Sequence, residues 1–182
     1  MSKVVFEGKE PKVHESVFLA PGSWIVGDVT IGEGSNVWFG AIVRGDDDTV
    51  RIGARTTVLD NCIIEAPTGL PVDIGDDTII SHGAVVHGAK IGNKVLVGIG
   101  AMVLDGAEVG DGSIVGSGAL IPPRSKIPPN QLVIGLPGKA IREVRDGERE
   151  YLAKEHERTY TKAKKYKAVL PTRSQIFGTK RH

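Results

Sequence analysis

Two histidines that stand five residues apart, His82 and His87, are the side chains in this sequence best suited to chemistry. Two imidazoles and one carboxylate form a known catalytic zinc set, in which a fourth position stays open for water. The metal lowers the pKa of that water and produces hydroxide near neutral pH. Glu65 is the carboxylate that we expect to complete the set. Alternatively, the two histidines are polar residues that only form hydrogen bonds at an interface between copies of the chain.

An acidic run, Asp46-Asp47-Asp48, follows Arg44 and Gly45. Carboxylates close to a metal can accept protons and pass them on, so this run is a candidate proton carrier. The alternative is a solvated insertion without a catalytic role. We expect Arg44 and Asp46 to form an ion pair.

The elements that position these residues follow from an internal repeat of six residues. A period of six is neither that of a half-buried strand nor that of an amphipathic helix. Each repeat therefore supplies one short strand and one corner, and three repeats close a coil of about eighteen residues. The sequence predicts an all-β solenoid, a parallel β-helix. An aliphatic residue opens each repeat at Val13, Leu19, Ile25, Ile31, Val37, Val43, Ile52, Val58, Ile64, Ile74, Ile80, Val86, Ile91, Val97, Val103, Val109, Val115, Ile121, Ile127 and Val133.

Three interruptions of the repeat mark the places where a site could form: insertions at residues 44–51 and 66–73, and a deletion between Val86 and Ile91. Counting in coils of three repeats stacks Arg44, Glu65 and His87 in one column. The same count stacks Asp60 on His82, on another face of the prism. A metal held by Glu65, His87 and His82 would then most simply lie between prisms, with His82 supplied by a neighbouring chain. A threefold arrangement would make three such sites.

The repeat stops at about Gly138, and helical spacing begins. Apolar and aromatic residues then recur at intervals of three and four, with Lys, Arg and Glu between them. We expect a β-helix domain over 1–138, a C-terminal helix over 139–171 that packs on it, and a tail over 172–182. The helical stripe comprises Leu152, His156, Tyr160, Ala163, Tyr166 and Leu170.

The composition excludes several classes of protein. With 40% hydrophobic residues, 25% charged residues and a net charge of +1, the chain is not typical of a disordered protein. No apolar run approaches the length of a membrane span, the first residues lack a signal-peptide core, and Cys62 is the single cysteine. We therefore predict a cytoplasmic protein. Residues 139–182 carry 13 Lys and Arg against 6 Asp and Glu, but without the pattern of a nucleic-acid tail.

Several segments resemble the γ-class carbonic anhydrase family, which includes ferripyochelin-binding-protein homologues: VWFGAIVRGDDDTVRIG at 37–53, ISHGAVVHGAKIG at 80–92, VGIGAMVLDGAEVGDGSIVGSGALI at 97–121 and IPPNQLVIGLPGKAIRE at 127–143. The resemblance implies a left-handed helix sense and a homotrimer with a metal at each interface. It matches Arg44 and Asp46 to an interfacial pair, Asp60 to the family's Asp after the second strand set, and His82 and His87 to two of three metal-binding histidines. Where the family usually has Gln and the first metal-binding His, this sequence has Leu59 and Glu65.

These departures bear on function. A carboxylate in place of a neutral imidazole lowers the net charge at the metal, so bound water should lose its proton less readily. The first hypothesis is a lyase that hydrates CO2 to bicarbonate with a divalent metal, zinc before iron or cobalt. Its metal ligands are Glu65, His82 and His87, and its catalytic residues are Arg44, Asp46, Asp47 and Asp60. The alternatives are a catalytically silent trimeric scaffold and a hexapeptide acyl-CoA acyltransferase with His82 or His87 as general base.

Overall fold

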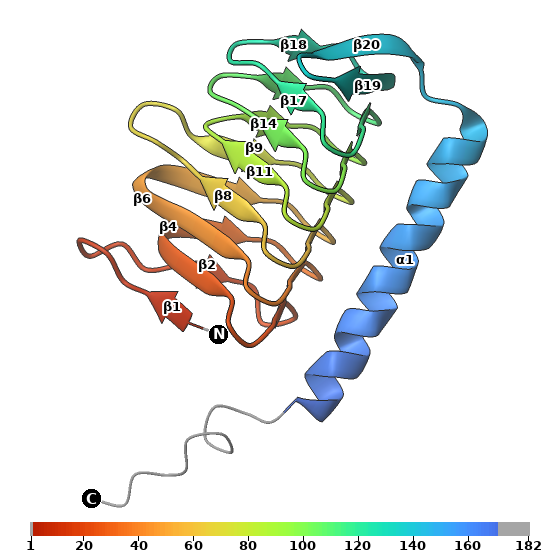
Figure 1. Cartoon of the computed structure of the whole chain (residues 1–182). Helices are drawn as coiled ribbons and strands as arrows, with labels where there is room; N and C mark the ends of the chain where they lie inside the picture. Colours follow the sequence, from red (N-terminus) through yellow and green to blue (C-terminus); the bar gives the residue numbers. More distant parts are fainter. Residues whose placement is uncertain (1, 171–182) are drawn as a thin grey trace, which may run out of the picture.

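Short parallel strands, stacked coil upon coil, make up most of the computed structural model, which describes residues 2–170 (Figure 1). The pairing between successive coils is parallel at every strand of the repeat region. The chain is a left-handed parallel β-helix of hexapeptide repeats with about seven coils and one C-terminal helix. The predicted fold is therefore confirmed.

The coils form a prism with three faces. Strands β4 (Trp24–Ile31) and β6 (Ile42–Ile52) are long enough to run across the corner between the first two faces. Face 1 also contains β1 (Ser2–Val4), β8 (Ile63–Glu65), β11 (Val85–His87), β14 (Met102–Val103) and β17 (Leu120–Ile121). Face 2 contains β2 (Lys12–Val13), β9 (Val72–Ile74), β12 (Lys90–Ile91), β15 (Glu108–Val109) and β18 (Lys126–Ile127). Face 3 contains β3 (Phe18–Leu19), β5 (Asn36–Val37), β7 (Thr57–Val58), β10 (Ile79–Ile80), β13 (Leu96–Val97), β16 (Ile114–Val115), β19 (Gln131–Gly135) and β20 (Gly138–Glu143).

The interior is filled by the aliphatic residues that open each repeat, most of them fully buried. Small hydroxyl residues close one corner of the prism and link each coil to the next. The side chains of Ser35, Thr56 and Thr78 donate hydrogen bonds of 2.6 to 2.8 Å to carbonyl oxygens one coil on. These bonds satisfy polar groups that burial would otherwise make costly. The hydroxyl stack therefore helps to hold successive coils in a fixed register.

The first insertion is ordered strand. Residues 44–51 lie within β6, which pairs with β4 on one side and with both β8 and β9 on the other. The extra length bends around a corner. The register against β4 passes from Gly27 with Gly45 to Val29 with Val50, so residues 46–49 have no partner in that ladder. As a result, Arg44 is held by backbone pairing on both sides, with Val26 of β4 and with Glu65 of β8.

The C-terminal region differs in part from the expected helix over 139–171. Residues 138–143 form β20, which pairs antiparallel with β19, the strand of the last coil. The helix α1 runs from Asp146 to Val169. Arg142 donates hydrogen bonds of 2.7 and 2.8 Å to the carboxylate of Glu148, in the first turn of α1. The strand forms because the last coil offers an open backbone edge that β20 can pair with.

Helix α1 covers face 3, as the predicted stripe requires (Figure 1). Ala163, Tyr166 and Leu170 pack against Phe18 and Trp38 in a small aromatic cluster. The Trp38 and Tyr166 rings meet edge to face with 5.5 Å between centroids. Within residues 2–170, no helix has the length and apolar character needed to cross a membrane. The tail predicted over 172–182, together with Pro171, lies outside the described residues.

Candidate metal centre

The column of Arg44, Glu65 and His87 is present on face 1. Strand β6 pairs with β8 so that Arg44 lies beside Glu65, and β8 pairs with β11 so that Glu65 lies beside His87. Adjacent strands are about 4.8 Å apart. The residue count along the repeat thus predicted correct neighbours for three chemically distinct side chains.

Glu65 is held from below by Arg44. Arg44 Nη2 donates a hydrogen bond to Glu65 Oε1, and Arg44 Nη1 lies 3.4 Å from Asp46 Oδ2. The expected ion pair between Arg44 and Asp46 is therefore present within one chain. Asp46 Oδ1 is buried and has no hydrogen-bond partner among residues 2–170. Asp47, by contrast, is exposed.

His87 is held from above by a residue that the sequence reasoning did not single out. The ring nitrogen Nδ1 of His87 contacts Oδ1 of Asp105, which lies on the coil corner just after β14. This contact occupies one ring nitrogen, so Nε2 is the nitrogen left for a ligand. Asp105 stands two residues after Val103, whereas His87 directly follows Val86, so their positions in the repeat do not match. Only the reach of the side chains joins them.

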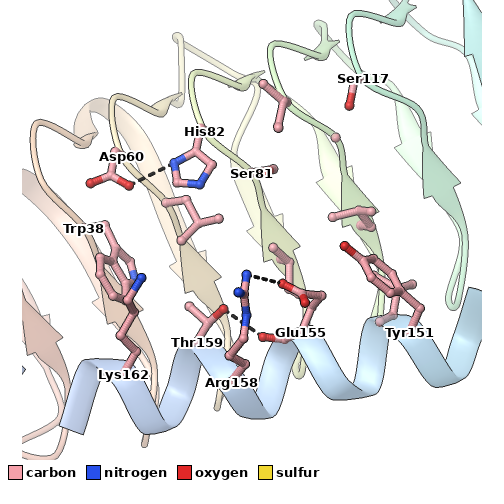
Figure 2. A pocket seen from close by; sticks show the side chains of 16 residues that line it. Trp38, Asp60, Ser81, His82, Ser117, Tyr151, Glu155, Arg158, Thr159 and Lys162 are labelled. Atoms are coloured by element: carbon pink, nitrogen blue, oxygen red, sulfur yellow. Dashed lines mark hydrogen bonds and ion pairs between the residues drawn. The ribbon is translucent and has the colours of Figure 1, made fainter. Parts of the chain in front are cut away.

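His82 and Asp60 form the second predicted column. His82 Nδ1 lies 2.9 Å from Asp60 Oδ2, and both residues sit on successive coil corners between face 3 and face 1 (Figure 2). The corner backbone after each of them is left-handed, at Asn61 with φ of 59° and at Gly83 with φ of 66°. Here too Nδ1 is occupied, and Nε2 remains free for a ligand. His82 is half-exposed.

Leu59 has a different surrounding. Its side chain packs against the aromatic cluster between α1 and face 3, where it contacts the group that includes Trp38 and Phe39. It also lines the cavity that has Asp60 and His82 at its rim. Leu59 thus contributes to the packing of α1 on face 3 and also lies next to the column of Asp60 and His82.

Within one chain the two columns flank face 1. His82 lies on the corner before β11, and His87 is the last residue of β11. Among residues 2–170, no three His, Cys, Asp or Glu side chains gather closely enough to hold a metal ion. Cys62 is fully buried in the hydrophobic core, and burial raises the pKa of its thiol to about 12. A single chain therefore does not bring both histidines and Glu65 together within the described residues.

Face 1 also has an outward row of apolar side chains, which we call the apolar column: Trp24, Ile42, Ile63, Val85, Met102 and Leu120. Trp24, Ile42 and Ile63 are 38 to 47% exposed. They alternate along the strands with the buried core residues. Val85, Met102 and Leu120 are partly exposed. An apolar row of this kind, on the face that has Glu65 and His87, is typical of a surface that another protein covers.

A cavity of about 430 Å³ lies between face 3 and α1 (Figure 2). Asp60 and His82 lie at its rim, on the coil corners. On the helix side, Arg158 donates a 2.6 Å hydrogen bond to Glu155. The floor is apolar, with Ile79, Leu96 and Ile99 among its residues. The cavity is large enough for a small organic molecule that approaches the His82 imidazole.

Comparisons with known proteins show which families the chain resembles. Residues 88–123 match the family model described as bacterial transferase hexapeptide, six repeats. A protein of Methanocaldococcus jannaschii named "Probable carbonic anhydrase" is 52% identical over 136 residues, which are 75% of this chain and 86% of that protein. A carbonic anhydrase of Geobacillus kaustophilus is 37% identical over 175 residues, 96% of each chain. The solved structure of a Bacillus cereus protein, provisionally named an acetyltransferase, is 35% identical with a TM-score of 0.91 and covers 92% of this chain and 98% of its own.

Proposed function

Because the chain belongs to the γ-class carbonic anhydrase family, we propose that it assembles as a homotrimer, binds a divalent metal between neighbouring copies, and hydrates CO2 to bicarbonate there. The proposed ligands are His87 and Glu65 of one copy and His82 of the next. The proposal includes a cytoplasmic location and the chain itself as its only protein partner.

One observation carries the proposal. Each of the three candidate ligands uses one of its two polar side-chain atoms to contact a single neighbouring charged side chain. Asp60 contacts His82 at Nδ1, Asp105 contacts His87 at Nδ1, and Arg44 contacts Glu65 at Oε1. Each contact leaves one donor atom free, Nε2 on the histidines and Oε2 on the glutamate. Metal-binding histidines almost always donate their other ring N–H to a carboxylate, a carbonyl or water. The three contacts orient the candidate ligands in the way that outer contacts orient the ligands of a metal centre.

The free atoms suit a borderline divalent ion. Two imidazole nitrogens and one carboxylate oxygen fit zinc, with cobalt and ferrous iron as alternatives. Such an ion lowers the pKa of a water molecule and thereby supplies a nucleophile near neutral pH. Proton transfer and the orientation of the ligands are then tasks of the side chains of the protein.

Two aspartates are suited to proton transfer. Asp46 Oδ1 is buried without a partner among the described residues, so it can accept a hydrogen bond or a proton from a group that enters the site. Asp47 is exposed and can release a proton to solvent. In this assignment Arg44 orients Glu65 and Asp46, and Asp60 orients His82. Arg44 and Asp60 therefore act through their neighbours.

The threefold assembly rests on the geometry of face 1. His82 stands on the corner before the face, and Glu65 and His87 stand toward the other side of the same strands. When three prisms pack around a threefold axis with this face directed toward the axis, one edge of each copy meets the opposite edge of the next. The apolar column is then buried, which is the main favourable contribution to association.

Acyl transfer is the second candidate function. The observation that favours it is the pair His82 and Asp60 at the rim of the 430 Å³ cavity, because a carboxylate-oriented imidazole is a general base. The family membership and the separate column of Glu65 and His87 favour the metal site. A trimeric scaffold that binds metal without catalysis is the third outcome of the test.

The test uses His82→Ala and His87→Ala chains, separately and as a mixture. Each variant alone should lose bound zinc and CO2 hydration, measured by elemental analysis and by a pH-indicator assay. Chains that are unfolded together and refolded as an equal mixture should regain metal at about a quarter of the sites, because random assembly pairs an intact His82 with an intact His87 that often. No regain would contradict a site shared between copies. Metal without CO2 hydration in the wild type supports the scaffold, and turnover of acetyl-CoA supports the acyltransferase.

A further inference from the structure

We propose that Asp105 is a positioning residue that fixes the tautomer and the orientation of the His87 ring. The inference rests on the proposed metal site for its purpose, but its central observable is a property of the metal-free protein.

The contact between the two residues connects adjacent coils. Asp105 follows β14, the strand that pairs with β11 through Val85 with Met102 and Val86 with Val103. One step further along this register, His87 lies beside Leu104, and Asp105 stands on the corner just beyond. From that corner its carboxylate reaches back to His87 Nδ1. The ring is therefore held at its Cβ by one coil and at Nδ1 by the next.

The chemistry of the contact selects one form of the ring. A neutral imidazole has one N–H and one bare nitrogen, and the two tautomers exchange unless a neighbour favours one of them. An ionised carboxylate can only accept a hydrogen bond. The proton must therefore be on Nδ1, which leaves the lone pair on Nε2. A ring in this form needs no proton rearrangement to bind a cation.

The second histidine has the same arrangement independently. His82 Nδ1 lies 2.9 Å from Asp60 Oδ2, two coil corners with no residue in common with the first pair. His14, by contrast, uses Nδ1 to contact the neighbouring hydroxyl of Ser16. Carboxylate contacts at Nδ1 thus occur at both histidines of the predicted set.

Removal of the Asp105 carboxylate should leave the coil intact. Among the described residues, the Asp105 carboxylate forms a hydrogen bond or ion pair only with His87, whereas its backbone carbonyl accepts the 2.8 Å hydrogen bond from Arg124 N that closes the corner. Alanine keeps that backbone bond. Asp73 on face 2 is a matched control, because it also makes one ion pair with a residue of an adjacent coil and is 42% exposed against 43% for Asp105.

The experiment compares the wild type with Asp105→Ala, Asp105→Asn and Asp73→Ala. Long-range proton–nitrogen NMR of metal-free, histidine-labelled protein at about pH 8.5, roughly two units above the ordinary imidazole pKa, reads which nitrogen of His87 bears the proton. The wild type and Asp73→Ala should have it on Nδ1, and Asp105→Ala should shift it largely to Nε2. Asp105→Asn should give a mixture of the two tautomers, because an amide can either accept a hydrogen bond from Nδ1 or donate one to it. A His87 ring in Asp105→Ala that keeps the proton on Nδ1 would overturn the inference.

Metal affinity gives the second measurement. Titration with cobalt, followed by its visible absorption, should show roughly 10- to 100-fold weaker binding in Asp105→Ala and unchanged binding in Asp73→Ala. Equal affinity in Asp105→Ala and wild type would contradict a positioning role. If the wild type binds no cobalt, the proposed function fails, while the tautomer measurement still decides whether Asp105 positions the ring.

Discussion

Faces 1 and 2 have the same backbone and opposite surfaces. On both faces, the residue before each buried aliphatic points outward and stacks on its equivalents in the coils above and below. On face 1 these residues are the apolar column. On face 2 they form what we call the charge ladder: Arg51, Asp73, Lys90, Glu108 and Lys126, which alternate in sign from coil to coil.

The charge ladder suits face 2 to contact with solvent. Arg51 lies 3.3 Å from Asp73, and Glu108 lies 3.7 Å from Lys126. Alternating charges stabilise neighbouring strands slightly, and a charged row discourages the strands of another molecule from docking. Face 1 lacks this protection where the candidate ligands are. The interior of the prism is the same behind both faces. One outward residue per coil therefore decides whether a face suits solvent or a partner.

Exchanging the two surface types should have the largest effect. In Ile63→Lys, assembly would bury an unpaired charge, which costs several kcal/mol. We expect the dissociation constant of the trimer to rise by more than about a hundredfold. The reverse exchange on face 2, Lys90→Ile, should leave the trimer unchanged. Sedimentation velocity measures both. A stable trimer of Ile63→Lys would show that face 1 is not the interface.

Glu65 tests whether face 1 also binds the metal. Glu65→Ala should lose bound metal as His87→Ala does. Glu65→His should keep the metal and move the pH profile of CO2 hydration to lower pH, because the net charge around the ion rises by one. Leu59→Gln added to Glu65→His tests whether a polar side chain is also needed for turnover. Full metal occupancy in Glu65→Ala, measured by elemental analysis, would reduce the site to two histidines.

The charge ladder should give a smaller effect. Position 108 lies between Lys90 and Lys126 on face 2, so Glu108→Lys makes a row of three positive charges on successive coils. The free energy of unfolding should fall by about 0.5 to 1 kcal/mol at low ionic strength, and most of this loss should disappear in about 1 M salt. Urea unfolding with and without salt measures it, with Glu108→Gln as the uncharged control. A loss that salt does not change would exclude a surface electrostatic origin.

The smallest expected effect is on thermal stability, at the start of the helix that covers face 3. It is also the effect that depends most on pH. Hydrogen bonds from Arg142, and then from the backbone of Arg145, lower the pKa of Glu148 from 4.5 to about 2. This interaction stabilises the fold above the ordinary pKa of the group and is lost as the pH falls through about 2. Glu148→Gln should therefore melt below the wild type at neutral pH, and the two should converge in strong acid. Glu150→Gln is the control on the same helix turn.

The sequence predicted what depends on the period of the repeat. Arg44, Glu65 and His87 hold the same position in successive coils, so counting alone makes them neighbours, and the same holds for Asp60 and His82. Asp105 holds a different position from His87, and its contact depends on side-chain direction at a corner, which the period does not contain. Strand β20 was not predicted because its partner edge exists only after the last coil has formed.

The length of α1 has a consequence for folding. Its 24 residues span roughly 36 Å at about 1.5 Å each, close to the roughly 34 Å of seven stacked coils. At its start, Glu148 of α1 pairs with Arg142 of the β19–β20 hairpin. At its other end, Lys167 donates a 2.8 Å hydrogen bond to the carbonyl oxygen of Glu15 in the first coil. An open solenoid frays from its ends, since each unit contacts only its neighbours. Here the helix works as a clasp between the first and last coils, and native-state hydrogen exchange should show both ends opening together with it.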